Sequence, residues 1–407
     1  MKNRTNRVIK RLTQSFLSLF VITSFSSFAN QPIPISNAAP APTAAKPPLI
    51  IPAPPRISAK AYVLMDANSG AIIAQKNMQE RLPPASLTKL MTLYVTSEAL
   101  AQGQINLDDK VHISKEAWSR GGSRMFLKEG SYVSIRELIQ GIIVASGNDA
   151  CVAIAQYIGG SETGFARMMN DAAKRLGMTD SHFVDSTGLP KPGHYTTAYD
   201  LATLTRALIN QFPQYYGWYK QKWIKYNKIK QPNRNRLLWR DPSVDGLKTG
   251  HTDAAGYCLI ASALRHGMRL ISVVMGTPSD AARSNNSQLL LNWGYRYYRT
   301  YKLFQANTSI TKARVWLGKK NELALGITKD MYVTIPAGEY KSIQATIKLQ
   351  PKLRAPIVKG QVYGEIEVNL KGKTIAKAPL IALNGDPRAG WLSRTIDHIG
   401  LFFKNIF

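Results

Sequence analysis

The segment Pro84-Ala-Ser86-Leu-Thr-Lys89 decides how the rest of the chain is interpreted. A serine three residues before a lysine, at the start of a helical run, places a hydroxyl and an amine on one face about one turn apart. This is the smallest arrangement in which an amine can activate a serine nucleophile. The same spacing recurs at Ser309-Ile-Thr-Lys312, so the pattern alone is weak evidence.

Two later motifs distinguish these copies. Ser146-Gly-Asn148 and Lys248-Thr249-Gly250 follow Ser86 in order, whereas neither follows Ser309. The ordered set resembles the signature of penicillin-binding proteins and serine β-lactamases. Ser86 is therefore the expected nucleophile, and the three motifs are expected to meet in one cleft.

Each residue of the first two motifs has a chemical reason to be present. Lys89 must be partly neutral to accept the Ser86 proton, and both burial and the Lys248 ammonium would lower its pKa. Ser146 can relay a proton to a leaving amine. Asn148 can hold Lys89 and a substrate amide.

The third motif suits a substrate carboxylate. Lys248 and Thr249, on an expected edge strand, would present a positive charge and a hydroxyl, and Gly250 would let substrate approach the strand closely. The backbone N–H groups of Ser86 and His251 are natural donors to an oxyanion. The His251 side chain is an alternative base, but Lys89 already fills that role.

The N-terminus predicts export. Residues 1–29 combine five Lys or Arg, an apolar run over 16–25 and the small residues Ser27 and Ala29 at a cleavage site, as in a signal peptide; an uncleaved anchor is the alternative. Removing this segment takes the net charge from +28 to +23. An exported basic protein meets anionic lipids and wall polymers more often than nucleic acid.

The cysteine count excludes a disulfide framework. Cys151 and Cys258 are the two cysteines of the chain. Cys151 is expected to be a buried, inert thiol, although a bridge to Cys258 stays open. No CxxC or HExxH pattern occurs, so neither a metal nor another cofactor is expected.

With 407 residues, the chain is long enough for two domains. Residues 30–56 are rich in Pro and Ala and predict an extended linker. In 57–300, strand-like runs near both ends enclose a helical block, which predicts an α+β core whose terminal strands share one sheet. The expected strands are 61–65, 71–74, 256–262 and 269–275, and the helix carrying Ser86 is expected over 85–101.

The last hundred residues differ in composition. Residues 301–385 hold short β-like runs separated by Gly and Pro, which predicts a small all-β domain, expected to be a sandwich. Residues 388–407 place apolar and aromatic side chains on one helical face, which is typical of a helix lying in a membrane interface; a helix docked on its own domain is the alternative.

Longer strings narrow the resemblance. Ser146-Gly-Asn-Asp-Ala-Cys151, Asn233-Arg-Asn235 with Leu237-Leu-Trp239, and Asp245 through Gly256 are similar to the low-molecular-mass penicillin-binding proteins that act as D-alanyl-D-alanine carboxypeptidases, the group typified by penicillin-binding protein 5. The resemblance runs from about residue 57 to the C-terminus. It implies a β-lactamase/transpeptidase-like catalytic domain, the all-β domain and the amphipathic anchor.

The family also implies an activity and a location. Such a serine enzyme removes the terminal D-Ala from peptidoglycan stem pentapeptides through an acyl-enzyme, here on Ser86, and is acylated by β-lactam antibiotics. It implies a periplasmic protein attached to the outer face of the inner membrane through 388–407. By position, Arg234 matches an arginine near the substrate carboxylate and Arg283 one at the edge of the cleft. Asp200 matches an aspartate associated with activity, and 120–125 a loop beside the site.

The sequence disfavours three other functions. A class A β-lactamase needs a Glu-x-x-Leu-Asn element, whereas Glu162, in another context, is the one glutamate between Cys151 and Asp245. A non-catalytic wall-binding protein would be expected to have lost at least one motif residue. Nucleic-acid binding depends on charge alone and is opposed by the signal peptide.

Overall fold

The computed structural model describes residues 32–33, 50–391 and 395. Contacts divide the chain into two compact units, of which one combines 36–308 with 327–343 and the other combines 1–35, 309–326 and 344–407. The expected signal peptide lies outside the described residues, and so does most of the expected helix 388–407. No helix in the described part of the chain is long and apolar enough to cross a membrane.

The catalytic unit is built on a five-stranded antiparallel sheet with the order β3-β2-β10-β9-β8. The strands from both ends of the unit therefore share one sheet, as the sequence predicted. Strand β8 is an edge strand and pairs along its length with β9. The bounds are β2 (Ala61–Asp66), β3 (Ile72–Lys76), β8 (Val244–Thr252), β9 (Gly256–Arg265) and β10 (Met268–Thr277).

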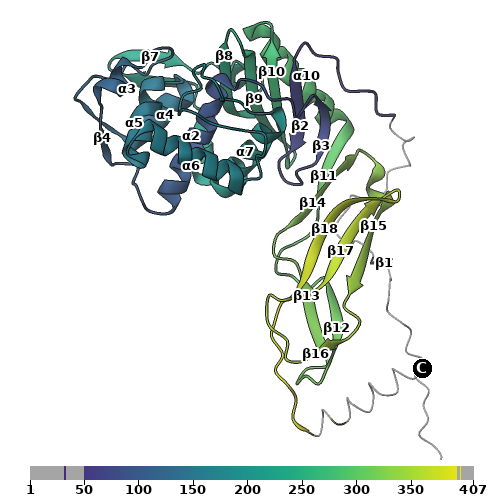
Figure 1. Cartoon of the computed structure of the whole chain (residues 1–407). Coiled ribbons are helices and arrows are strands. Elements are labelled where there is room, and N and C mark those ends of the chain that lie inside the picture. Colours follow the sequence, from purple (N-terminus) through teal and green to yellow (C-terminus); the bar gives the residue numbers. More distant parts are fainter. Residues whose placement is uncertain (1–31, 34–49, 392–394, 396–407) are drawn as a thin grey trace, which may run out of the picture. The chain divides into compact units, whose positions relative to one another are not determined.

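Helices cover both faces of this sheet (Figure 1). In β2, Val63 and Met65 belong to one apolar core, whereas Tyr62 and Leu64 belong to another, because successive strand residues point to opposite faces. The second core is closed by α10 (Asp280–Tyr297). The first core is closed by the helical block: α2 (Lys89–Ala101), α4 (Ile135–Val144), α5 (Asn148–Gly159), α6 (Glu162–Arg175) and α7 (Ala198–Gln211).

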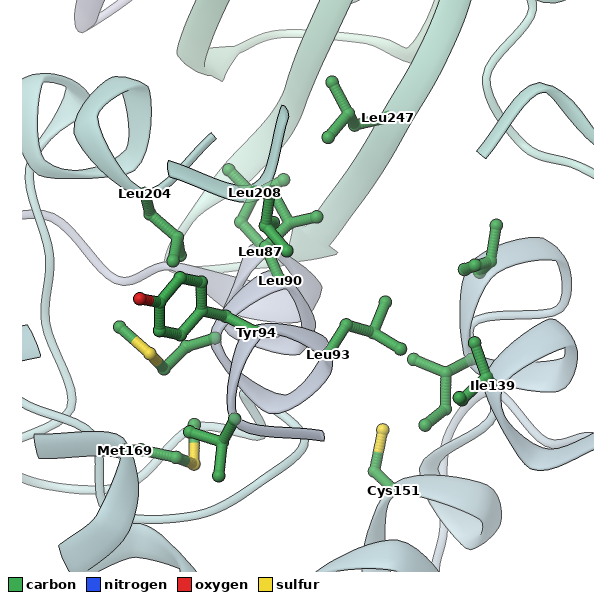
Figure 2. Packing of buried hydrophobic residues seen from close by; sticks show 14 of the residues in the cluster. Leu87, Leu90, Leu93, Tyr94, Ile139, Cys151, Met169, Leu204, Leu208 and Leu247 are labelled. Carbon is green, nitrogen blue, oxygen red and sulfur yellow. The ribbon is translucent and has the colours of Figure 1, made fainter. Parts of the chain in front are cut away.

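Helix α2 is the centre of the block. Its side chains are buried around nearly the whole circumference, which is typical of a helix inside a core and not at a surface. Figure 2 shows Leu90, Leu93 and Tyr94 among side chains from α4, α5, α6 and α7. The helix that follows Ser86 is thereby held on every side.

Shorter elements complete the catalytic unit. Two of them, β6 and β7, form a hairpin, and β11 pairs with β14 within the same unit. The bounds are η1 (Ala85–Thr88), β4 (Lys110–His112), α3 (Lys115–Ser119), β5 (Tyr132–Ser134), α8 (Pro213–Tyr216), η2 (Gly217–Lys220), β6 (Trp223–Tyr226), β7 (Ile229–Pro232), α9 (Leu237–Arg240), β11 (Tyr298–Phe304), β14 (Met331–Pro336) and η3 (Glu339–Ser342).

The second unit is all-β, in agreement with the sequence, but its strands form one hydrogen-bonded sheet of seven in the order β1-β15-β17-β18-β13-β12-β16. A sandwich of two separate sheets was expected; instead β13 pairs with both β12 and β18 and joins the halves. Its bounds are β1 (Pro32–Ile33), β12 (Thr311–Trp316), β13 (Glu322–Gly326), β15 (Ile343–Leu349), β16 (Leu353–Arg354), β17 (Val362–Leu370) and β18 (Lys373–Ala382). Strand β1 comes from the segment interpreted as a linker.

Candidate active site

Ser86 lies in the short 3₁₀ turn η1, and the α-helix begins only at Lys89. The sequence predicted one continuous helix over 85–101. The difference begins at Ala85, whose φ of 47° lies in the left-handed region that few non-glycine residues adopt. Pro84 and Ala85 turn the chain sharply just before Ser86. Strained backbone of this kind is common at functional sites.

Lys89 is fully buried, and its Nζ lies 2.6 Å from Ser86 Oγ and 2.9 Å from the Thr187 carbonyl oxygen. Burial, with the Arg234 guanidinium as a further cause, lowers the pKa of Lys89 from 10.5 to about 8. The sequence predicted this effect from burial and from Lys248; burial is the main cause, whereas the cation that contributes is Arg234. A substantial fraction of the amine is therefore neutral near pH 8, and it lies within hydrogen-bond reach of the hydroxyl.

The Thr187 carbonyl is fixed by a buried aspartate. Asp185 accepts hydrogen bonds from the backbone N–H groups of Thr187 and Gly188, at 2.8 and 2.7 Å. Gly188 has a φ of 84°, and a Cβ there would lie 1.8 Å from the Ala85 carbonyl oxygen. This loop therefore packs directly on the turn that carries Ser86, and sequence reasoning did not identify it.

Ser146 and Lys248 form the second polar pair. Lys248 Nζ donates to Ser146 Oγ at 2.9 Å, and both side chains are almost fully buried. Burial, together with the nearby Lys89 ammonium, lowers the pKa of Lys248 well below 10.5. Ser146 has a φ of 59°, which reverses the chain between α4 and α5 and turns its hydroxyl toward β8.

Asn148 is buried with an unpaired acceptor. Its Nδ2 donates to the Gly121 carbonyl oxygen at 2.6 Å, while its Oδ1 has no hydrogen-bond partner within the described residues. The expected contact with Lys89 is replaced, because Lys89 donates to Ser86 and Thr187 instead. The unpaired Oδ1 is itself buried, so it can accept from a substrate amide N–H only after a small shift of the groups around it.

The loop that contains Gly121 is held by Asp149, a residue that the sequence analysis did not single out. Its two carboxylate oxygens accept from the backbone N–H groups of Met125 and Leu127, at 2.8 and 3.1 Å. Asp149 directly follows Asn148 in α5. One turn of helix therefore supplies both a polar group of the site and the anchor of the loop beside it.

An ion pair links this loop to the Thr187 loop. Arg120 Nη2 lies 2.6 Å from Glu162 Oε2, and Glu162 Oε1 accepts from Ser186 Oγ at 3.0 Å. Glu162 is the residue that the sequence analysis rejected as a hydrolytic base. Its observed partners give it a structural use, because it joins the two loops whose carbonyl oxygens bind Lys89 and Asn148.

Edge strand β8 passes beside η1. Thr249 is buried, and the space above Gly250 is already filled, since a Cβ there would lie 3.1 Å from the Pro84 carbonyl oxygen. The sequence analysis assigned the glycine to substrate approach; the structure gives it the packing of η1 against β8. His251 is exposed and stacks on Tyr257, with the ring centroids 3.9 Å apart.

The two arginines differ in surroundings. Arg234 donates to Ser123 Oγ at 2.8 Å, and its side chain is partly exposed. Arg283 is buried, pairs with Asp280 and donates to the Gly250 carbonyl oxygen at 3.1 Å. Arg234 can reach a ligand directly, whereas Arg283 supports β8 from behind and adds positive charge.

The remaining candidates lie apart from the nucleophile's own contacts. Asp200, in the first turn of α7, accepts from Ser181 Oγ and from the Asp180 backbone N–H, which fixes the turn that follows α6. Cys151 and Cys258 are both buried and free, so the bridge that the sequence left open is not formed. Burial raises the pKa of the Cys151 thiol to about 12. No cluster of metal-ligating side chains occurs among the described residues.

A cavity of about 300 Å³ lies beside η1. Its walls are mainly apolar and come from η1, the loop after Gly188 and the end of β8; they include Pro83, Pro84, Leu189, Pro190, Pro192 and Ala254. The polar groups around Ser86 are thus flanked by an apolar hollow, the usual combination in sites that bind small organic groups.

Two family profiles match this chain. One, described as D-alanyl-D-alanine carboxypeptidase of peptidase family S11, covers residues 49–279, and the other, described as penicillin-binding protein 5, C-terminal domain, covers 298–388.

Individual relatives agree with the profiles. The chain is 45% identical to the D-alanyl-D-alanine carboxypeptidase DacC of Escherichia coli, over 87% of this chain and 90% of that protein. Its fold is similar to the crystal structure of penicillin-binding protein 5 from Haemophilus influenzae, with a TM-score of 0.79, 44% identity and coverage of 82% of this chain and 99% of the other. Penicillin-binding protein 6B from Escherichia coli gives a TM-score of 0.68 at 40% identity, over 83% and 99% of the two chains.

Proposed function

The chain belongs to the D-alanyl-D-alanine carboxypeptidase family of peptidases, and on this basis we propose that it removes the terminal D-Ala from peptidoglycan stem pentapeptides through an acyl-enzyme on Ser86. The observation that carries the proposal is the buried Lys89 amine, 2.6 Å from the Ser86 hydroxyl with a pKa of about 8. β-Lactams, whose ring opens on the same nucleophile, acylate Ser86 in this proposal.

Acylation begins when neutral Lys89 takes the Ser86 proton and Oγ attacks the carbonyl carbon of the penultimate D-Ala. The backbone N–H groups of Ser86 and His251 stabilise the oxyanion. The C–N bond then breaks, and the proton that Lys89 accepted passes through Ser146, which lies 2.9 Å from Lys248, to the departing amine of D-Ala, so that Lys89 is neutral again. Lys89 then takes a proton from water, whose oxygen attacks the ester carbonyl carbon; the bond to Ser86 Oγ breaks, and Lys89 returns the proton to Oγ.

Substrate binding uses the remaining candidates. Lys248, Thr249 and Arg234 attract the C-terminal carboxylate, and Asn148 Oδ1 accepts the amide N–H of the stem. The apolar cavity beside η1 takes apolar parts of the acyl chain. Arg283 acts through the Gly250 carbonyl oxygen and not by direct contact.

Intact mass after mixing with benzylpenicillin tests this proposal, with Ser86→Ala as control. A one-to-one adduct on the parent that persists for minutes and is missing from the variant, together with D-Ala release from a soluble pentapeptide, is expected. Rapid consumption of penicillin without a lasting adduct would instead identify a β-lactamase. Neither adduct nor turnover would favour a non-catalytic wall-binding protein.

We also propose that the protein is periplasmic and attached peripherally to the inner membrane through 388–407. The support is the signal-like segment 1–29 and the apolar face of the terminal segment. Sedimentation with vesicles of phosphatidylglycerol and phosphatidylcholine, for chains ending at 407 and at 387, tests the attachment. Equal sedimentation of both chains would exclude the terminal segment as the anchor.

A further inference from the structure

The hairpin of β6 and β7, together with α9, forms a strongly basic surface. Residues 213–240 contain eight Lys or Arg and neither Asp nor Glu. Five of these cations are lysines in 220–230, the hairpin and its entrance. A surface whose charges are all positive attracts anionic partners and repels cationic ones.

Two lysines of the hairpin face each other directly. Lys225 and Lys230 are cross-strand partners, and neither has an ion pair in the described part of the chain. Like charges directly opposite in an antiparallel pair destabilise it. Because Ile224 on the other face is buried, the face with the lysines is the one toward solvent. The arrangement is explained if an anionic ligand occupies this face.

Aromatic rings lie among these cations. Trp223 shares a hairpin face with Lys225, and Trp239 of α9 packs against it with the centroids 6.0 Å apart at 83°. Both rings keep more than two fifths of their surface exposed. Lys230 Nζ lies 4.6 Å from the Trp223 centroid. The negative face of an aromatic ring attracts the polarised C–H bonds of a sugar ring, while an adjacent cation attracts carboxylates.

The surface is continuous with the candidate active site. Asn227 Nδ2 donates to the Phe126 carbonyl oxygen at 3.0 Å, and Gln231 Nε2 to that of Arg124 at 3.2 Å. These acceptors lie in the loop that also contains Gly121, the partner of Asn148. The segment 233–235, which carries Arg234, connects β7 to α9. A ligand on the hairpin can therefore belong to the same molecule as a ligand in the cleft.

We propose that Trp223, Lys225, Lys230 and Trp239 form a binding surface for the glycan strand of peptidoglycan. Sugar rings pack on the two indoles, and carboxylates of neighbouring stem peptides pair with the two lysines, while one stem of the same polymer occupies the cleft. The inference rests on the proposed function for the identity of the polymer. It predicts that polymeric peptidoglycan is bound more tightly than an isolated pentapeptide.

Three variants separate binding from folding. Lys225→Gln with Lys230→Gln removes the charges and also the repulsion between them, so its melting temperature is expected to equal or exceed that of the parent. Trp223→Ala removes one ring. Lys110→Gln with Lys174→Gln removes the same charge from exposed sites on β4 and α6 and is the matched control.

Two measurements use these variants in the full chain. The first is sedimentation with purified, lipid-free sacculi, in which the parent and every variant also carry Ser86→Ala. The Kd is expected to be about tenfold higher than that of the parent for either hairpin variant, and within about twofold of it for the control. With Ser86 intact, D-Ala release from polymeric peptidoglycan is expected to fall by a similar factor, and release from a soluble pentapeptide by less than about twofold. Added salt should reduce the difference in Kd between the parent and the lysine variant, because salt screens the charges.

Several outcomes would overturn the inference. They are unchanged sacculus binding by both hairpin variants, an equal loss with the control, or equal losses of turnover on polymeric and soluble substrates. Loss of binding to phosphatidylglycerol vesicles without loss of sacculus binding would assign the surface to lipid instead. If the parent released no D-Ala from the soluble pentapeptide, the proposed function would fail, while the sedimentation experiment, which needs no turnover, would still test the surface.

Discussion

Replacing Lys89 by methionine tests the electrostatics of the site through folding and not through catalysis. Methionine has a similar length and no charge, so it removes the buried amine while largely filling its space. The loss of two hydrogen bonds should lower the free energy of unfolding of Lys89→Met, whereas the loss of a buried charge should raise it. We expect this second effect to be strongest at low pH. The informative quantity is the difference between variant and parent as a function of pH.

The magnitude follows from the pKa of Lys89, about 8 in the folded protein against 10.5 for a free lysine. A depressed lysine pKa means that the unfolded chain binds more protons between pH 8 and 10.5, so the stability of the parent rises with pH across this window. The whole window corresponds to about 3 kcal/mol. The advantage of the variant should therefore be largest below pH 8 and shrink by about that amount toward pH 10.5. Lys89 also lowers the pKa of Lys248, so its removal lets the Lys248 pKa rise, and this change acts in the same direction.

Urea unfolding of both proteins at several pH values from 7 to 10, followed by tryptophan fluorescence, measures this difference. Groups that titrate in both proteins cancel. Ser86→Ala is the control, because it removes an acceptor of Lys89 without removing the charge, and its difference from the parent should change little with pH. A difference between Lys89→Met and the parent that is the same at pH 7 and pH 10 would refute the depressed pKa.

Three further predictions concern the same site. The rate constant for acylation of Ser86 by benzylpenicillin, followed by stopped flow, should rise about tenfold per pH unit below 8 and level off above it, because Lys89 must be neutral; a flat profile would exclude Lys89 as the base. Gly250→Ala should slow acylation about tenfold with little change in melting temperature, because its Cβ would press η1 at the Pro84 carbonyl oxygen; unchanged acylation would show that η1 yields freely. Glu162→Gln should lower the free energy of unfolding by about 1–3 kcal/mol, measured by urea titration, because Arg120 keeps its charge but loses a partly buried partner; an effect near zero would mean that the pair does not fasten the loops.

Much of the fold could be predicted from the sequence. The spacing of Ser86 and Lys89 predicts their contact, because three residues of helix or 3₁₀ turn both place side chains on one face. The shared sheet follows from apolar strand-like runs at both ends of the unit. The order of β12 and β13 beside β18 did not follow, since short alternating runs do not specify which strands pair.

The supporting contacts of the site could not be predicted in the same way. Lys89 and Asn148 bind the carbonyl oxygens of Thr187 and Gly121, and a carbonyl belongs to every residue, so no residue type marks it. Glu162 was noticed for a role that it does not have in this geometry. Its pairing with Arg120 depends on how two distant loops approach each other, which local patterns do not encode.

The use of those two carbonyl oxygens has a consequence for how the protein can change over generations. A point mutation can remove a side chain, but it cannot delete a main-chain oxygen. Residues 121 and 187 can therefore diverge in identity among descendants while still serving the lysine and the asparagine, provided the loops keep their paths. An antibiotic that acylates Ser86 would then select for changes that displace these loops. Such mutations would be found at the residues that anchor the loops, such as 149, 162 and 185.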